Sequence, residues 1–94
     1  MQRATIGKTV FYHFMHKDDD QEPVLRWRPA IVVDVVPGED NRLELAVLFS
    51  QLDHPAFPEP PRNVGALMGV EWRFDVPAVA DGAVPEPGTW SWPH

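Results

Sequence analysis

The chain has 94 residues, 44% of them hydrophobic and 23% charged, which suits one globular domain with a modest core. It has no cysteine, which excludes disulfides and thiolate metal sites and fits a reducing cytoplasm. Its net charge of −6 argues against a nucleic acid partner. The longest apolar run is too short to cross a bilayer, and the opening residues lack the apolar region of a secretory signal, so we expect no membrane partner.

The first predicted strand covers 9–15, TVFYHFM, because this segment is β-branched and aromatic. Both of its faces are largely apolar, so we expect it to be covered on both sides or to lie at a barrel corner. An acidic loop ending at Pro23 follows. The second predicted strand covers 30–36, AIVVDVV. Pro29 cannot donate a ladder hydrogen bond, so we expect it at the start of that strand, at an edge or at a bulge.

The next two predicted strands show alternating hydrophobicity. After the turn PGEDN, the segment RLELAVLFS predicts a hairpin from about 30 to 49, with these side chains inward: Leu43, Leu45, Val47 and Phe49. The segment 50–68 is rich in proline and predicts an irregular loop. The following segment, GVEWRFDV, predicts a strand whose inward side chains are Val70, Trp72, Phe74 and Val76 and whose outward side chains are Glu71, Arg73 and Asp75.

No segment has a helical period, so the sequence predicts an all-β fold in a single domain over 1–94. We expect a small SH3-like barrel of four or five short strands, with the irregular loop at about 50–68 and a Pro-rich tail at about 77–94; a small β-sandwich is the alternative. The tail ends in GTWSWPH. In an extended tail Trp90 and Trp92 project to one side, and we expect both to pack on the outer surface of the barrel or to cap its open end.

The inventory of reactive residues predicts a protein without catalytic residues, metal or cofactor. No serine or threonine lies in a nucleophile motif, and no Gly-rich loop precedes a helix. The segment HFMHKDDD gathers His13, His16 and the acidic cluster 18–20. However, the two histidines point to opposite faces of a strand, and the acidic cluster lacks the glycine of a calcium loop. We therefore interpret this segment as a solvated loop.

Two arginines lie beside tryptophans, in RWR at 26–28 and in EWRF at 71–74. Arginine and tryptophan together recognise flat anions through stacking and bidentate hydrogen bonds. The sequence therefore predicts an anion site with Arg28 and Arg73, and with Trp27 or the tail indoles of Trp90 and Trp92 as the stacking platform. The alternative is internal pairing of the two arginines with Glu71, with Glu44 or with the acidic cluster.

Four segments, IGKTVFYHF, RPAIVVDVV, LELAVLF and GTWSWP, resemble a group of small, mostly uncharacterised proteins encoded by tailed phages and prophages. The matching residues are Gly7, Val10 and Tyr12; Arg28 to Val33; Leu45, Val47 and Phe49; and Gly88 to Trp90, Trp92 and Pro93. The resemblance covers most of the chain except the loop from about 50 to 68. It implies a phage origin and a compact β fold, and it supplies no activity.

These observations favour a non-enzymatic, phage-encoded binding protein in the cytoplasm of the infected host cell. We expect it to sequester a small anionic signalling ligand or to block a host defence protein, and to form a homo-oligomer. The alternative is a virion accessory protein that decorates the capsid or fills a tail joint and contacts other virion proteins. A small hydrolase is the third possibility.

Overall fold

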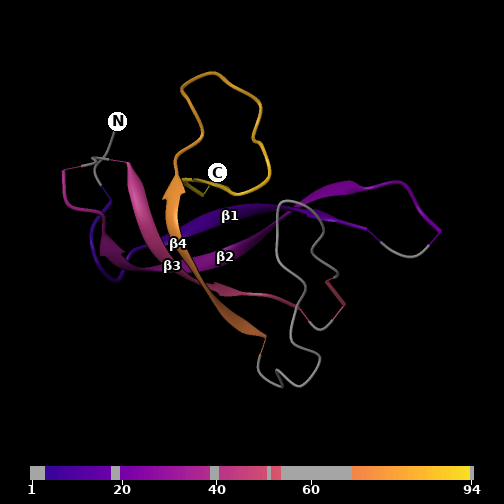
Figure 1. Cartoon of the computed structure of the whole chain (residues 1–94), viewed down its shortest axis with the longest axis horizontal. Helices are drawn as coiled ribbons and strands as arrows, with labels where there is room; N and C mark the ends of the chain where they lie inside the picture. The colour runs from indigo at the N-terminus through magenta and orange to yellow at the C-terminus, as the bar shows by residue number, and fades with distance from the viewer. Residues whose placement is uncertain (1–3, 18–19, 39–40, 51, 54–68, 94) are drawn as a thin grey trace.

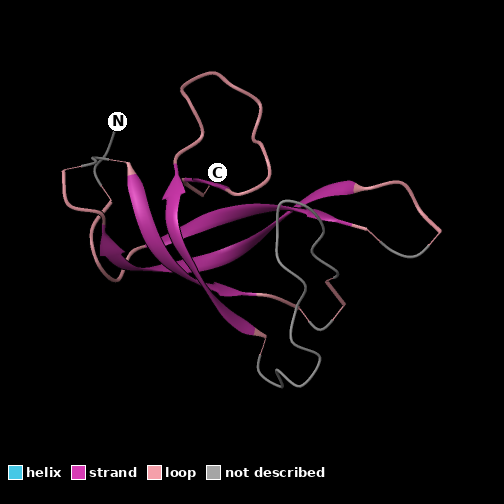
Figure 2. Ribbon diagram, in the orientation of Figure 1, coloured by secondary structure: helices cyan, strands magenta, loops and turns pink. Residues whose placement is uncertain are grey.

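Five antiparallel strands form one sheet in the computed structural model of the chain, which describes residues 4–17, 20–38, 41–50, 52–53 and 69–93. The strands are β1 (Thr9–His16), β2 (Val24–Val35), β3 (Arg42–Leu48), β4 (Val70–Pro77) and β5 (Thr89–Ser91). Their order in the sheet is β4-β3-β2-β1-β5 (Figure 1). The described residues contain no helix (Figure 2), which confirms the all-β prediction.

The two ends of this strand order meet at one point. Ala78, just after β4, forms a parallel bridge with Trp90 of β5, and the amide of Val79 donates to the carbonyl oxygen of Trp90 at 2.8 Å. A single sheet whose outer strands touch is curled into a small barrel. This arrangement favours the predicted barrel over a sandwich of two stacked sheets.

The core lies inside the curled sheet and is built from alternate residues of each strand. Leu43, Leu45 and Val47 of β3 are fully buried, and Phe49 is nearly so, which confirms the inward face predicted for this strand. The ring of Phe49 packs edge-on against that of Phe14, with the ring centres 5.0 Å apart. The remaining buried apolar residues are Ala4, Val10, Tyr12, Ala30, Val32, Val76 and Trp90.

Strand β2 begins at Val24, six residues before the predicted start, and Pro29 lies inside it. The amide of Val32 donates to the carbonyl oxygen of Lys8, on the β1 side of β2. Backbone groups alternate between the two sides of a strand, so those of Pro29 point toward β3, where the β2–β3 ladder begins only at Ala30. The missing amide hydrogen therefore costs no ladder bond. Residues 24–28 pair with residues 12–16 of β1, and we call this two-stranded ribbon the arm; it extends beyond β3 and β4 (Figure 1).

The face predicted for β4 is wrong over most of the strand. Trp72 and Phe74 are 52% and 69% exposed, and only Val76 is buried. The cause is a bulge: the register moves from Leu45↔Arg73 to Leu43↔Val76, so β4 carries one residue more than β3, and Asp75 has a left-handed φ of 53°. The bulge reverses the alternation and places Arg73 on the inward face.

A glycine is required where the chain enters β4. Gly69 has a φ of 68°, and a Cβ at this position would collide with the carbonyl oxygen of Phe49. The same approach lets the amide of Phe49 donate to the carbonyl oxygen of Gly69 at 2.8 Å. This close pairing begins the β3–β4 ladder and fixes which residues of β4 face β3.

Candidate functional site

The inner face of the arm is tied to the barrel by a buried carboxylate. Arg28 donates from Nε to Asp53 Oδ2 at 2.6 Å and from Nη2 to Oδ1 at 2.7 Å. Arg26 donates to the same carboxylate at 3.2 Å, and the Ser50 amide at 2.8 Å. Burial raises the pKa of Asp53, but the hydrogen bonds outweigh it and hold this pKa below its ordinary value. The carboxylate therefore stays ionised at neutral pH and fixes the arm.

On the outer face of the sheet, β2 presents exposed apolar side chains. Trp27 is 51% exposed, and its ring stacks on that of Phe11 with the ring centres 4.0 Å apart. Leu25 and Ile31 lie on the same face of β2, two residues before and four after Trp27, and both are exposed. We call Leu25, Trp27, Pro29 and Ile31 the β2 stripe. Strand alternation places Arg28 on the opposite face from this stripe, so Arg28 and Trp27 do not form one site.

Arg73 lies inside the sheet rather than on its surface. Its side chain is 13% exposed, its Nη2 lies 3.3 Å from Glu71 Oε1, and its guanidinium carbon lies 5.2 Å from the centre of the Phe49 ring. The outward position predicted for Arg73 is wrong, because the β4 bulge turns it inward. The pair with Glu71 is the internal partnership that the alternative interpretation named. Both arginines thus hold a carboxylate, and their role in binding an anion stays a prediction.

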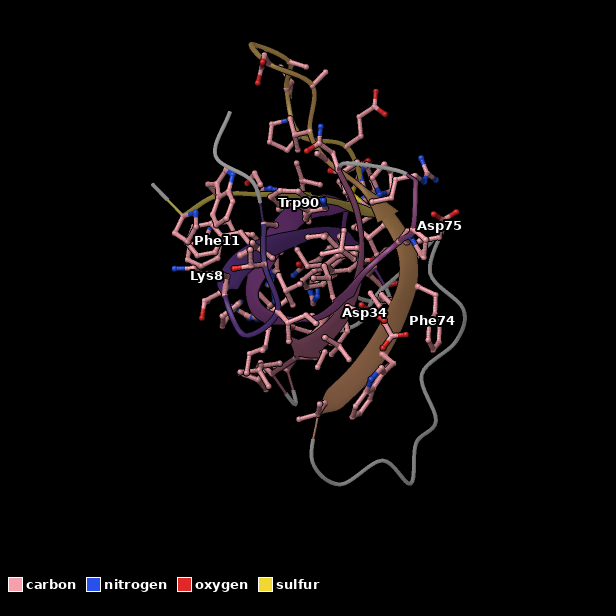
Figure 3. The ribbon with its side chains drawn as sticks, turned by 90° about the vertical axis from the view of Figure 1, so that its left-hand side faces the viewer. Lys8, Phe11, Asp34, Phe74, Asp75 and Trp90 are labelled. Atoms are coloured by element: carbon pink, nitrogen blue, oxygen red, sulfur yellow. The ribbon has the colours of Figure 1, made fainter. Side chains whose placement is uncertain are left out.

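The tail forms β5 and pairs with β1 of the same chain, with Tyr12 opposite Trp90. Trp90 is 1% exposed, and its indole Nε1 donates to the carbonyl oxygen of Asn41 at 2.9 Å. In the view of Figure 3, Trp90 lies at the upper end of the barrel. Of the two positions predicted for Trp90, the outer surface is therefore wrong. Trp90 is a core residue, because the bridge at Ala78 covers it from the β4 side.

Trp92 packs edge-on against Trp90, with the ring centres 5.6 Å apart, and is partly buried. It lines a pocket of about 330 Å³ between the tail and the loop 78–85. The other lining residues are mostly alanine, glycine and proline, and Asp81 is the charged one among those described. The pocket is therefore apolar with a negative border, which does not suit an anion.

β5 also brings Ser91 beside His13, whose Nε2 lies 2.7 Å from Ser91 Oγ. Thr89 and Ser91 alternate with the two tryptophans along the extended tail and so face away from the indoles. Sequence reasoning missed this pair, because its members are 78 residues apart. Among the described residues no group of three or more His, Cys, Asp or Glu side chains could hold a metal ion. Asp18 and Asp19 of the acidic loop lie outside those residues.

No helix in the described part of the chain is long and apolar enough to span a membrane. Comparison of the chain with protein-family models, with curated proteins and with solved structures finds no significant match. The candidate site is the β2 stripe, where the exposed indole of Trp27 is supported by the ring of Phe11.

Proposed function

We propose that this chain is a non-catalytic binding protein that docks on a partner protein through the outer face of its arm. The observation that carries the proposal is Trp27, half exposed on one face of a ribbon whose other face is held by Arg28 and Asp53. Tryptophan is enriched among the residues that dominate binding energy at protein interfaces. An indole held outward has apolar surface that a partner can bury.

The arm is prepared for binding before a partner arrives. A two-stranded ribbon alone is marginally stable in water. Here Arg26 and Arg28 fasten it from one side, and the ring of Phe11 supports Trp27 from the other. Because these contacts already order the indole, docking loses less conformational entropy than it would with a flexible loop.

The charge of the arm indicates the chemistry of the partner. The segment that joins β1 to β2 in the chain reads KDDDQE at residues 17–22 and carries four carboxylates and one lysine. Asp20 and Glu22 of this segment are exposed. Electrostatic complementarity then favours a partner whose surface has an apolar pocket bordered by lysine or arginine.

The resemblance to small phage proteins suggests the setting of this proposal. In an infected cell the partner would be a host protein, including a defence protein that the docking blocks. Docking on another virion protein remains the alternative. Sequestration of an anionic ligand is less favoured, because Arg28 and Arg73 already hold Asp53 and Glu71.

The test is site-specific photo-crosslinking in infected cells and in purified particles. A benzophenone side chain replaces Ile31, which leaves Trp27 intact, and the control replaces Val84, which is 80% exposed in the loop 78–85. We expect one host protein crosslinked from position 31, lost when Trp27→Ala is added, and no crosslink from position 84. A capsid or tail protein crosslinked in particles would support the virion alternative. Equal crosslinking from both positions would contradict the proposal.

A further inference from the structure

We infer that the outer edge of β4 pairs antiparallel with β4 of a second copy of this chain, so that two barrels share one continuous sheet. This interface goes beyond the proposed function and uses other residues. β4 lies at the end of the strand order and meets β5 only beyond its end, at Ala78, so from Val70 to Phe74 one side of its backbone has no neighbouring strand among the described residues. Proteins normally cover or interrupt such an edge, because it is a template for strand addition.

The edge is apolar as well as open. The bond from the Phe49 amide to Gly69 sets the alternation of β4: Glu71 and Arg73 direct their backbone groups to β3, and Val70, Trp72 and Phe74 direct theirs outward. These three residues are 38%, 52% and 69% exposed. On this edge the carbonyl oxygen of Trp72 accepts a hydrogen bond of 3.0 Å from Arg73 Nη1, which leaves the second lone pair of that oxygen for another donor.

A twofold axis at Trp72 makes this edge complementary to itself. Trp72 then lies opposite the partner's Trp72, and Val70 lies opposite the partner's Phe74. The backbone N–H and C=O groups that point outward on the two copies therefore meet and exchange hydrogen bonds. On the other face of the sheet Glu71 lies opposite the partner's Arg73. Cross-strand aromatic and aliphatic pairs and opposite charges both stabilise a sheet.

Charge also excludes the neighbouring registers. If the pairing of the two β4 strands slips by one residue, the backbone groups that point outward on one copy lie opposite groups that are already hydrogen-bonded to β3 on the other. The next registers with matching backbone groups place the axis at Glu71 or at Arg73, and each sets like charges directly opposite each other. The register centred on Trp72 is therefore the one in which the backbone and both faces agree.

The edge and the β2 stripe do not compete for space. Figure 3 shows Phe74 projecting from the side of the barrel opposite to Phe11, the residue on which Trp27 stacks. A dimer through β4 consequently leaves both arms exposed. Because the two surfaces use different residues, the dimer and the proposed docking can be tested independently: Trp27→Ala should leave the dimer intact.

The first test uses single cysteines. The chain has no cysteine, so a disulfide formed by Trp72→Cys must join two copies. Directly opposite residues of a hydrogen-bonded pair have Cα atoms about 5.5 Å apart, within disulfide range. We expect oxidised Trp72→Cys to run at twice 10.7 kDa. Trp27→Cys is the control, because Trp27 is as exposed as Trp72. Equal crosslinking at both positions, or none at position 72, would overturn the inference.

The second test measures mass against concentration by light scattering. Trp72→Pro removes an amide hydrogen that points away from β3 and meets no other described strand of the monomer. It should therefore raise the concentration for half-dimerisation more than about tenfold while the dilute protein melts as before. Arg73→Glu should also weaken the dimer, and the added Glu71→Arg should restore it. A wild-type mass of 10.7 kDa at every soluble concentration would refute the pairing.

Discussion

Arg28 and Asp53 are joined by two hydrogen bonds of 2.6 and 2.7 Å although 25 residues separate them in the chain. The pair links the arm to the segment that follows β3. It also explains why an arginine stands beside Trp27 in the sequence: successive strand residues point to opposite faces, so one residue anchors the arm and the other is presented to solvent.

Asp53→Asn tests this anchor. The substitution keeps the size of the side chain and removes its charge, which leaves two guanidinium groups without their carboxylate. Because Asp53 is buried and Arg28 is about one-third exposed, we expect a loss of about 2–3 kcal/mol in the free energy of unfolding, measured by urea denaturation at pH 7. Asp75→Asn is the matched control, because Asp75 pairs with Arg42 at the surface, and it should change stability little. Equal effects of the two substitutions would contradict the anchor.

The same pair predicts a dependence of stability on pH. The pKa of Asp53 is lower in the folded chain than in the unfolded chain, so the carboxylate stabilises the fold fully above its unfolded pKa of about 3.9. That stabilisation is lost as the pH falls through the lower, folded pKa. Thermal unfolding between pH 7 and pH 2 should show wild-type stability falling below about pH 4, with a shallower fall for Asp53→Asn. Parallel curves would contradict the assignment.

Phe74 and Val76 should differ sharply in their contribution to stability. Phe74 is 69% exposed, so Phe74→Ala should change the free energy of unfolding by less than about 1 kcal/mol in dilute, monomeric protein. Val76 is 4% exposed in the core, so Val76→Ala should cost about 2–3 kcal/mol. The sequence pattern alone predicts a large loss for Phe74. Chemical denaturation of the two variants decides between the bulged and the regular strand.

Strand alternation was sufficient to predict β3, because its pairing with β2 and β4 keeps Leu43, Leu45 and Val47 on one face throughout. It failed in β4, where Trp72 and Phe74 look like core residues. Their direction depends on an extra residue opposite β3, and nothing within the β4 sequence marks that register shift. Alternating hydrophobicity identifies a strand but not a bulge in its pairing.

The site was predicted only in part for a related reason. The sequence drew attention to Arg28, Trp27 and the tail indoles. However, Asp53 lies in a proline-rich stretch and carries no local signal that it will be buried beneath the arm. Likewise, Trp90 and Trp92 look equivalent in GTWSWP. Both line the pocket beside the loop 78–85, but Trp90, which the bridge from Ala78 reaches, is fully buried in the core, whereas Trp92 is only partly buried.

The tail should be essential to the monomer. Trp90 fills the core and donates to Asn41 O, so Trp90→Ala should cost about 3–5 kcal/mol, and a chain ending at Pro87 should lose much of its stability at any protein concentration. Trp92→Ala removes a partly buried ring and should cost less. Thermal melting at two concentrations tests this. A truncated chain that stays folded would mean that β5 contributes little to the barrel.

The bulge at Asp75 can be tested through its backbone. A φ of 53° suits glycine and strains a β-branched residue, because Cβ crowds the backbone in the left-handed region. Asp75→Gly and Asp75→Val both remove the carboxylate that pairs with Arg42, so the difference between them isolates the conformational requirement. We expect the Val variant to melt several degrees below the Gly variant. If the two melt together, β4 has no left-handed residue at position 75, and the outward direction of Trp72 and Phe74 then needs another cause.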